Sequence, residues 1–586
     1  MEAQETLREV VLSHLQTGVS KYLSLQGLDL QLHQWKIRIE YSRNESFGDY
    51  STSFILENKK HLPGNPESIA KDLIVCLQDD KVFSHITFTK PGFINFRVAY
   101  TYLVQYIQET VFSENRQELY PQVADPQKIV FEFVSANPTG PLNIVSARAA
   151  ATGDCICSLL QKVGYKVQRE FYVNDYGNQV SLLGLSALAR LREHLGEELL
   201  FAEKDSEVFT EIDVQKNILP AEGYRGEYLS AVVESIYQKH KDLLEPLLKK
   251  QQYSDLAEKL SLYVVEENLA KQRKDLEAFG VEFDVFFRES KLHKSESVFS
   301  VLEKLQESGH VKQEEGKEVF LSTRFGDDKD RVVRRADGRP TYLLADIAYH
   351  QDKMLRGFDR MINIWGPDHH GYIARLQGAV QALGYKKEQF QVIISQQVNL
   401  LAKGEKLKMS KRLGQFQTME DLLTYLGESA KDVGRYFFIM RTLEAPLDFD
   451  LELAKDHSDK NPVFYLQYAH ARICSIFREI ELEVSLDAVR HLEVSEERER
   501  LAFWIARFPE EVLDAAKHME PHRFINYLHG FSKAFTKFYM AKNNRMKSQA
   551  GDVRKGLAYL AEASRVVLQE GLLLLGISAP ERLEKE

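Results

Sequence analysis

The chain has 586 residues, of which 44% are hydrophobic and 28% are charged, a composition typical of an ordinary soluble protein. Its formal net charge is −10 at pH 7, which argues against a general polyanion binder but still allows a local basic face to contact nucleic acid. One hydrophobic core does not extend over this length, so we expect about three to four domains of roughly 150 residues each.

Signals for targeting and for metal binding are weak. The N-terminal residues lack the apolar core of a signal peptide, and no apolar run approaches the length of a membrane span. The cysteines are too few to cross-link a chain of this size and lack the spacing of a zinc site; they are Cys76, Cys155, Cys157 and Cys474. We therefore expect a reducing, cytoplasmic setting, no membrane partner and no metal held by the protein alone.

Residues 1–120 are expected to form a small α/β domain. Apolar residues at helical spacing predict an opening amphipathic helix; they are Leu7, Val10, Val11 and Leu15. Strand-like runs then occupy residues 36–41, 86–89 and 91–97. The polar, turn-rich segment 43–50 fits a surface loop and a ligand-contacting loop equally well.

The stretch 128–179 predicts a βαβ unit at the centre of the chain. The apolar run at 129–134 is typical of a strand buried on both faces of a parallel sheet. A helix from about residue 143 to 161 follows a Pro-Thr-Gly-Pro turn, and 166–173 predicts the second strand. Nucleotides and phosphates bind where the first strand of such a unit ends and its helix begins.

A long excursion separates this unit from the next sheet elements. Residues 181–290 are mostly helical and heavily charged, which suggests an insertion into the nucleotide-binding fold. Short strands are predicted at 319–321 and 331–334, before an Asp-Gly turn. We place the catalytic domain at 121–455, with the helical insertion at about 181–340.

Two polar residues of a predicted helix at 342–350 are candidate ligands. Tyr342 and Asp346 stand four positions apart and therefore lie on the same face of that helix. From the pattern alone, an amphipathic helix with a solvated aspartate explains them too. The next strand, 362–366, is followed by two adjacent histidines, which indicate a metal only weakly because neighbouring strand residues point in opposite directions.

A basic, glycine-flanked loop at 403–414 follows a predicted buried strand at 390–395. Its basic residues could form a solvated surface. We interpret them as a mobile phosphate clamp, since the loop follows a core strand and lysines stabilise charge on transferring phosphates.

From about Asp456 onward the sequence predicts only helices. Two segments, 464–474 and 535–545, combine aromatic with basic residues. Aromatic residues at helical spacing usually belong to a core, so the pattern alone leaves a core and an RNA-binding surface both open.

Five motifs occur in order along the chain. They lie at residues 132–142, 172–175, 365–371, 408–411 and 461–465. Together they closely resemble bacterial class I arginyl-tRNA synthetase, and the resemblance extends over essentially the whole chain. It implies that ATP activates arginine to arginyl-adenylate with release of pyrophosphate, and that arginine then passes to the 3′ end of the arginine tRNA. Family members of this kind need bound tRNA before they activate the amino acid.

The resemblance also implies a domain architecture. We expect an α/β protein with a Rossmann-like parallel-sheet catalytic domain carrying insertions, a small N-terminal α/β domain and a C-terminal all-α domain. The N-terminal domain, 1–120, would contact the tRNA elbow, and the C-terminal domain, 456–586, would bind the anticodon. The candidate tRNA contacts in that last domain are Tyr465, Tyr468, Arg472 and Arg545. We expect a monomer.

Positions that match the family's motifs supply the candidate site residues. For arginine they are Glu132, Asn137, Tyr342, Asp346 and Asp368. For ATP they are Pro141, Asn143, Val145, Ser146, His369, Lys408, Met409, Ser410 and Lys411. The catalytic candidates are Lys408, Lys411, Asn143 and Ser146, with Mg²⁺ sharing the phosphate charge. The carboxylate of Asp346 suits the planar cationic fork of arginine, and lysine would leave buried partners unsatisfied.

One four-residue segment departs from the family pattern. Where the family carries His-x-Gly-His, this chain reads Asn-Ile-Val-Ser at 143–146, so both imidazoles are missing and the valine adds bulk. The asparagine and the serine suit a helix start and donate hydrogen bonds, but neither carries a charge. We favour an active enzyme, because the arginine-pocket residues and the 408–411 motif are retained. The alternative is a catalytically weak tRNA-binding paralogue; Asp346 argues against a synthetase for another amino acid.

Overall fold

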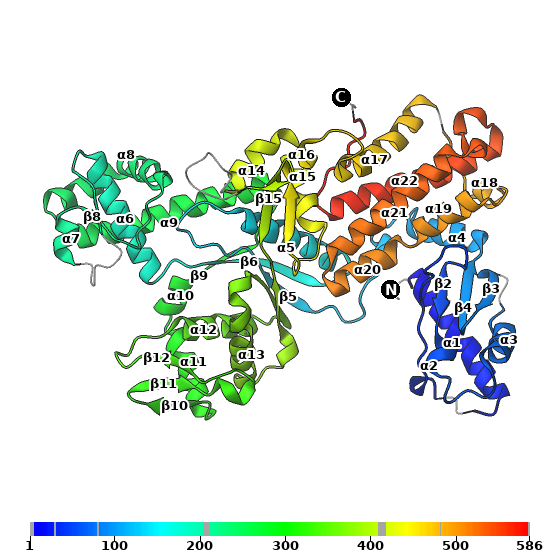
Figure 1. The fold of residues 1–586 in the computed structure, drawn as a ribbon, viewed down its shortest axis with the longest axis horizontal. Coiled ribbons are helices and arrows are strands. Elements are labelled where there is room, and N and C mark those ends of the chain that lie inside the picture. Colours follow the sequence, from blue (N-terminus) through cyan, green and yellow to red (C-terminus); the bar gives the residue numbers. More distant parts are fainter. Residues whose placement is uncertain are drawn as a thin grey trace. The chain divides into compact units, whose positions relative to one another are not determined.

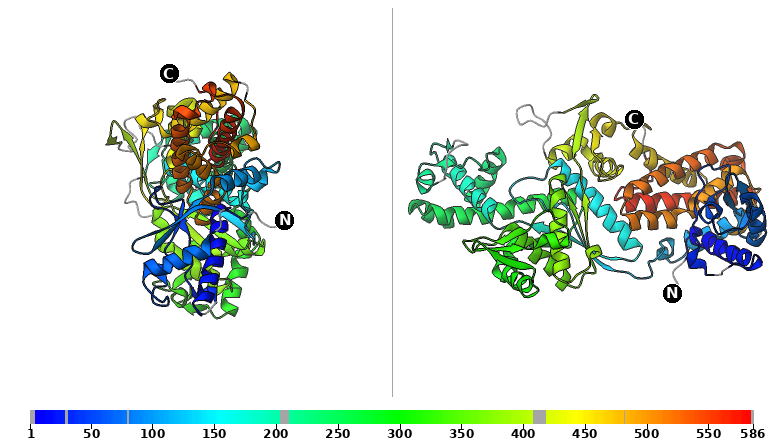
Figure 2. Two further views of the ribbon diagram at one scale, coloured as in Figure 1. Left: turned by 90° about the vertical axis from the view of Figure 1, so that its right-hand side faces the viewer. Right: turned by 60° about the horizontal axis from the view of Figure 1, so that its bottom comes forward.

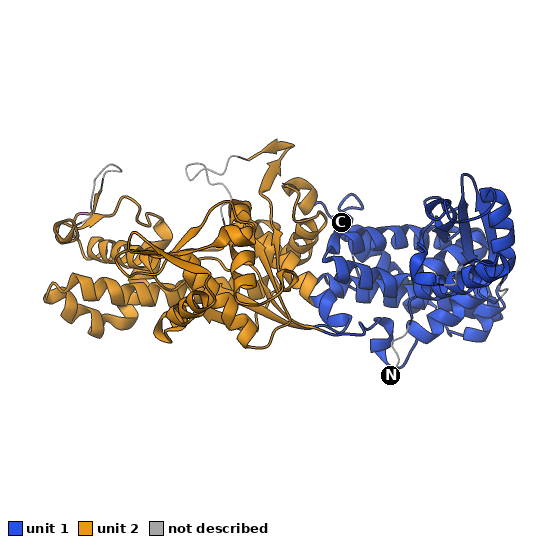
Figure 3. Ribbon diagram, turned by 90° about the horizontal axis from the view of Figure 1, so that it is seen from below, with its two compact units in different colours: residues 1–126, 158–165, 456–586 blue, residues 127–157, 166–455 orange. Residues whose placement is uncertain are grey.

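The computed structural model describes residues 5–28, 31–78, 81–202, 210–407, 418–480 and 482–583. The chain divides into two compact units (Figure 3). The first combines residues 1–126, 158–165 and 456–586, and the second combines 127–157 and 166–455. The N-terminal and C-terminal parts of the chain thus share one unit. None of the described helices combines the length and the hydropathy that a membrane crossing requires.

A five-stranded parallel sheet forms the centre of the second unit (Figure 1). In spatial order its strands are β14 (Phe390–Ile394), β13 (Arg360–Trp365), β5 (Lys128–Glu132), β6 (Lys166–Val173) and β9 (Val285–Arg288). The chain builds outward from β5 through β6 to β9 and then adds β13 and β14 on the other side. This is the doubly wound order of a Rossmann-like sheet, which confirms the predicted fold class. The order reverses between β5 and β13, where such sheets bind their ligands.

Helices pack on the central sheet. Val130 of β5 belongs to a hydrophobic core shared with α11 (Ser297–Glu307), α12 (Tyr342–Leu355) and α13 (Ile373–Ala382). The helix of the predicted βαβ unit is α5 (Ile144–Lys162). It passes so close to Phe133 that a Cβ at Gly153 would lie 2.5 Å from the ring. A glycine at this position therefore lets α5 pack directly against the chain segment that leaves β5.

Two segments depart from the sheet between β6 and β13. The first has its own hydrophobic core and comprises α6 (Asn178–His194), β7 (Leu200–Phe201), α7 (Glu211–Gln215), β8 (Ile218–Leu219), α8 (Glu227–Lys249) and α9 (Tyr253–Ala278). The second comprises α10 (Glu289–Lys294), α11 and an antiparallel sheet of β10 (Val311–Glu314), β11 (Lys317–Phe320) and β12 (Arg331–Arg334). Because β9 lies between them as a strand of the central sheet, residues 181–340 are not one continuous helical insertion.

The rest of the second unit follows β14. It comprises β15 (Val398–Ala402), β16 (Glu405–Lys406), α14 (Met419–Leu426), α15 (Ala430–Ile439), β17 (Leu447–Asp450) and α16 (Leu451–Lys455). The buried guanidinium of Arg435 in α15 donates to Asp154 of α5 at 2.6 Å. Asp154 also accepts from Arg169 of β6 at 3.0 Å. This ion-pair cluster joins the last helices of the unit to the βαβ core.

The N-terminal part of the first unit is an antiparallel sheet with helices. Its strands, in spatial order, are β1 (Glu40–Tyr41), β2 (Tyr50–Thr52), β4 (Phe93–Val98) and β3 (Phe83–Thr89). Its helices are α1 (Leu7–Leu25), α2 (Phe54–Glu57), α3 (Pro66–Leu77) and α4 (Tyr100–Thr110). The predicted opening helix is confirmed, and a capping box between Thr6 and Glu9 starts it. The strand predicted at 36–41 forms only at its last two residues.

The C-terminal part of this unit is helical in its described residues, as predicted. Its helices are α17 (Pro462–Glu479), α18 (Leu486–Arg490), α19 (Glu496–Ala506), α20 (Phe508–His518), α21 (Pro521–Met540) and α22 (Gly551–Leu574). The blue N-terminal part lies beside these helices in the right-hand view of Figure 2. Buried Glu510 of α20 joins the two, because it accepts hydrogen bonds from the Tyr50 hydroxyl and from the Arg8 backbone amide, both at 2.9 Å.

Candidate active site

The candidate site begins where β5 ends. After this strand the backbone of Val134 and Ser135 takes positive φ values of 67° and 39°, a conformation that is strained for side-chain-bearing residues and often found at functional sites. The turn brings the Ser135 hydroxyl within 3.0 Å of the Glu132 carboxylate, to which it donates. The same hydroxyl accepts the backbone amide of Tyr172 at 3.0 Å, which ties the turn to β6.

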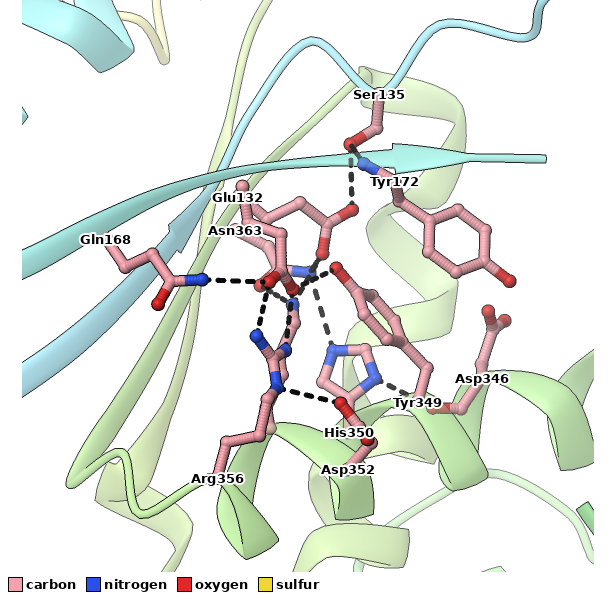
Figure 4. A network of polar contacts seen from close by, with 12 residues as sticks. Glu132, Ser135, Gln168, Tyr172, Asp346, Tyr349, His350, Asp352, Arg356 and Asn363 are labelled. Atoms are coloured by element: carbon pink, nitrogen blue, oxygen red, sulfur yellow. Dashed lines mark hydrogen bonds and ion pairs between the residues drawn. The ribbon is translucent and has the colours of Figure 1, made fainter. Parts of the chain in front are cut away.

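Glu132 lies in a buried polar network behind this turn (Figure 4). Its carboxylate accepts from the ammonium of Lys353 at 2.6 Å and from the amide of Asn363 at 2.9 Å. Lys353 is 0% exposed and Glu132 is 6% exposed, so the two charges neutralise each other away from water. Leaving either alone would bury an uncompensated charge, which costs several kcal/mol.

The network continues to the predicted arginine ligand Asp346. The ring of His350 donates from Nδ1 to the Asp346 carbonyl at 2.8 Å, and its Nε2 lies 3.4 Å from the Asn363 amide. Burial lowers the pKa of His350 well below its usual value, so the ring is neutral and Nε2 accepts. Side chains of β5, β13 and α12 thus form one connected hydrogen-bond network between the Glu132 carboxylate and the backbone carbonyl of Asp346.

Glu289 is a buried carboxyl and Asp346 a partly buried one, and neither has a strong cationic partner among the described residues. Asp346 accepts a hydrogen bond from the Tyr372 hydroxyl at 2.5 Å. Burial raises the pKa of Asp346 to about 7 and that of Glu289 to about 7. The negative charge of Glu132 also raises the pKa of Asp346, and the negative charge of Asp346 also raises that of Glu289. In the described part of the chain, neither forms an ion pair with lysine or arginine; the neighbour of Glu289 is His293, at 3.4 Å. Such a pair is poised to receive a cation.

Asp175, from the motif at 172–175, supports the position of Glu289. Its carboxylate accepts from the backbone amide and from the hydroxyl of Ser290, both at 2.9 Å. Asp175 therefore fixes the first turn of α10, on which Glu289 stands. A cavity of about 350 Å³ opens beside Glu289, and exposed Tyr342 also lines it. The cavity supplies a route by which a small polar ligand could reach the carboxyls.

The divergent segment 143–146 forms the start of α5. Asn143 caps the helix, because its side-chain oxygen accepts the backbone amide of Ser146 at 2.8 Å. The Ser146 hydroxyl donates to the same oxygen at 3.1 Å. The backbone of Asn143 also pairs with Thr418, and the Met419 amide donates to the Leu142 carbonyl at 2.8 Å. The start of α14 therefore lies against the start of α5.

The structure brings some predicted residues together and not others. Glu132 and Asp346 lie at the two ends of the network, and Tyr342 lines the nearby cavity. Asn137, Pro141, Asn143, Val145 and Ser146 follow one another through the turn into α5. Asp368 and His369 are exposed in the 3-10 turn Pro367–Tyr372, and Tyr372 of that turn makes the contact with Asp346. Lys408, Met409, Ser410 and Lys411 lie outside the described residues.

Sequence reasoning missed Lys353, Glu289 and Tyr372. A signal existed for Lys353, which stands seven positions after Asp346 and hence on nearly the same face of a helix rich in apolar residues. Nothing local distinguished Glu289, because its partners come from β6 and α12.

Three of the four predicted tRNA contacts lie in α17, and Arg545 lies between two 3-10 turns that follow α21. Tyr465, Tyr468 and Arg472 share one face of α17, and the guanidinium of Arg472 stacks over Tyr468 with 4.6 Å to the ring centre. Arg472 also lies 5.7 Å from the ring centre of Tyr539. Tyr539 and Arg545 line one cavity of about 260 Å³. Tyr468, Arg472, Tyr539 and Arg545 thus form a connected aromatic and cationic cluster, whereas Tyr465 stacks on His529.

The strand order and the carboxyl pair describe a nucleotide-binding α/β enzyme for a cationic substrate, and comparison with known families defines its class. The family model "tRNA synthetases class I (R), catalytic domain" matches residues 107–434. The model "Arginyl tRNA synthetase N terminal domain" matches 12–98, and "DALR anticodon binding domain" matches 466–583. The chain therefore belongs to the arginyl-tRNA synthetase family.

Relatives match over the full length. The chain is 59% identical to an arginine–tRNA ligase of Leptospira interrogans serogroup Icterohaemorrhagiae serovar copenhageni, with 100% of both chains covered. It is 39% identical to the arginine–tRNA ligase of Bacillus velezensis, again with 100% of both chains covered. The solved arginyl-tRNA synthetase of Thermus thermophilus shares the fold, with a TM-score of 0.74 at 20% identity over 99% of this chain and 100% of that one.

Proposed function

We propose that this chain is an arginine–tRNA ligase, which activates arginine with ATP to arginyl-adenylate and then transfers arginine to the 3′ end of the arginine tRNA. The family membership supports the reaction. The observation that carries the choice of amino acid is the pair of neighbouring carboxyls Asp346 and Glu289, each with a pKa raised to about 7 chiefly by loss of solvation. A guanidinium suits both, since its planar fork can donate hydrogen bonds to two carboxyls at once.

In this proposal the amino-acid site has two ends. Asp346 and Glu289 receive the guanidinium, with Tyr342 at the cavity mouth. Glu132 and Asn137 hold the amine end of the substrate near the switch point of the sheet. Lysine offers one compact ammonium and leaves part of the second carboxyl's hydrogen-bonding capacity unused, at a cost of about 1–3 kcal/mol for each buried group. That cost gives roughly tenfold to hundredfold discrimination per group.

The ATP phosphates would lie at the N-terminus of α5. Asn143 preserves the first helical turn there, and the following backbone amides and the helix dipole favour an anion. Lys408 and Lys411 would add positive charge in the reaction, and Pro141, Val145, His369, Met409 and Ser410 would line the nucleotide. No group of three or more His, Cys, Asp or Glu side chains in the described residues is arranged to hold a metal. Mg²⁺ therefore fits best as part of the substrate, bound to the phosphates of ATP.

The arginine tRNA is the proposed macromolecular partner. The N-terminal domain, 1–120, would contact the tRNA elbow, and the helical domain, 456–586, would bind the anticodon through the surface formed by Tyr465, Tyr468, Arg472 and Arg545. We further propose a cytoplasmic monomer. The competing function is a catalytically weak tRNA-binding paralogue, favoured by the missing histidines at 143–146.

Arginine-dependent ATP–pyrophosphate exchange, with and without the arginine tRNA, tests the proposal. We expect exchange that requires both arginine and tRNA. Tight tRNA binding without exchange in either condition would establish the paralogue instead. Exchange driven by lysine or another amino acid at an equal rate would contradict the assigned specificity.

Arginine activation is expected to depend on pH through the same carboxyl pair. A guanidinium binds the ionised carboxylates, and protons compete with it below the raised pKa of about 7. The KM for arginine should therefore fall as pH rises through about 7 and then level off. Below that point it should rise by up to about tenfold per pH unit for each protonated carboxyl. The affinity for tRNA, measured at the same pH values, serves as the control. A KM that stays constant across the range would contradict the assignment.

A further inference from the structure

Side chains of α8 and α9 hold the loop at 137–140 by its backbone. All four consecutive carbonyls of this loop accept a hydrogen bond from them. The Gln272 amide donates to the carbonyls of residues 137 and 140 at 3.1 and 2.8 Å, and the Asn268 amide donates to that of residue 138 at 2.9 Å. The Tyr228 hydroxyl donates to the carbonyl of residue 139. We call Tyr228, Asn268 and Gln272 the loop clamp.

The clamp is buried, and the loop depends on it. Gln272 is 0% exposed and Asn268 is 4% exposed. The loop belongs to no strand or helix, and prolines at 138 and 141 remove two backbone amides that could otherwise pair locally. Carbonyls in such a segment must find partners elsewhere, because an unsatisfied buried carbonyl is costly. Here the partners come from helices more than eighty residues later in the chain.

The clamp residues of α9 also lie next to a residue that contacts α14. Asn268, Lys271 and Gln272 lie at positions i, i+3 and i+4 of α9 and hence on one face. Lys271 forms an ion pair with Glu420 of α14 at 2.6 Å. The start of α14 in turn pairs with the start of α5 through Thr418. One face of α9 therefore contacts both the loop that leads into α5 and the helix that lies against the start of α5.

We infer that Asn268 and Gln272 are positioning residues for the activation site. The segment α6–α9 therefore contributes to the geometry of that site. This inference rests on the proposed function, because the clamped loop leads from Glu132 to the proposed contacts Asn137, Pro141 and Asn143. The clamp holds the loop without touching substrate. When the clamp is lost, the residues that contact arginine and those that contact ATP are no longer held in fixed positions relative to one another. The tRNA surface of the C-terminal helices is unchanged.

Gln272→Met tests the inference, since methionine keeps the length of the side chain but cannot donate. Hydrogen exchange of peptides that cover residues 133–146, followed by mass spectrometry, should become faster than in the unaltered protein. In ATP–pyrophosphate exchange with saturating tRNA, kcat/KM for arginine and for ATP should each fall by about tenfold or more. The Kd for tRNA should remain unchanged. Glu277→Gln is the matched control, because Glu277 is exposed on the same helix.

The Gln272→Glu variant distinguishes the effect of losing the hydrogen bonds to the loop from the effect of altered packing. A carboxylate has the same shape but repels the two carbonyls, whereas its protonated form donates one hydrogen bond. Its exchange activity, relative to the unaltered protein, should therefore recover as pH falls, and Gln272→Met should show no such recovery. The inference is overturned if loop exchange and both kcat/KM values in Gln272→Met equal those of Glu277→Gln. An unaltered protein without arginine-dependent exchange would contradict the proposed function, and the hydrogen-exchange measurement would still decide the clamp.

Discussion

Replacing Asp346 by asparagine is expected to lower kcat/KM for arginine activation by about a hundredfold or more. Asp346 and Glu289 are neighbouring carboxyls that form no ion pair with lysine or arginine in the described part of the chain. Asparagine keeps the shape of the side chain and can still accept the hydrogen bond from the Tyr372 hydroxyl. It lacks the negative charge that a guanidinium requires. It also presents an amide donor to a ligand that is itself all donors. The measurement is ATP–pyrophosphate exchange over a range of arginine concentrations, at a pH above 7.

Asp352→Asn provides the matched control, because Asp352 lies on the same helix and pairs with Arg356 at 2.8 Å near its end. It should leave arginine selectivity unchanged. The affinity for tRNA should be nearly the same in both variants and in the unaltered protein. If Asp346→Asn lost tRNA affinity and arginine activation to the same extent, Asp346 would be a structural residue and the specificity would lie elsewhere.

Replacing Lys353 by methionine is the second change with a large expected effect. It removes the counter-ion of Glu132 from a site shielded from solvent, and breaking a buried ion pair in this way typically costs about 3–5 kcal/mol. We expect a clearly lower thermal midpoint for the catalytic unit and a higher KM for arginine. Thermal unfolding followed by circular dichroism, together with arginine-dependent exchange, measures both effects.

A double variant distinguishes charge balance from simple loss of packing. Glu132→Gln combined with Lys353→Met removes both charges, and Asn363 and Ser135 can still hydrogen-bond the amide. The thermal midpoint of the double variant should recover most of the loss seen in Lys353→Met. A double variant that is as unstable as the single one would show that Lys353 acts through its packing against Tyr349, whose ring centre lies 4.2 Å from the ammonium.

The parts of the fold that local patterns determine were predictable. The apolar run before residue 135, the Pro-Gly turn and the helical spacing of α5 all lie within one βαβ unit, and the second strand forms at Lys166–Val173 as expected. The strand β9 escaped prediction because it has four residues and follows the long charged helix α9. Its place in the sheet depends on pairing with β6, which no local pattern reveals.

The candidate site likewise has residues that local patterns predict and residues that they do not. Tyr342 and Asp346 could be proposed from helical spacing together with a family resemblance. Glu289 could not be proposed in this way. It is a candidate ligand because it lies near Asp346 in space, and Asp346 is more than fifty residues away in the sequence. The spacing of residues in the sequence also does not show whether a charged side chain is buried. Lys353 resembles an ordinary surface lysine in the sequence, yet it is the buried cation that balances Glu132.

The position of β9 has a consequence for how this enzyme could be shortened. Because β6 and β9 are adjacent and parallel, the chain must return from the C-terminal end of β6 to the opposite end of the strands before β9 begins. The helix α9 makes this return journey, and its 26 residues extend for about 39 Å. It is therefore the crossover helix of a second βαβ unit, and α6 to α8 are an elaboration of its connecting loop. Deletion of α6 to α8 would remove Tyr228 from the loop clamp, and deletion of α9 would disconnect the sheet itself.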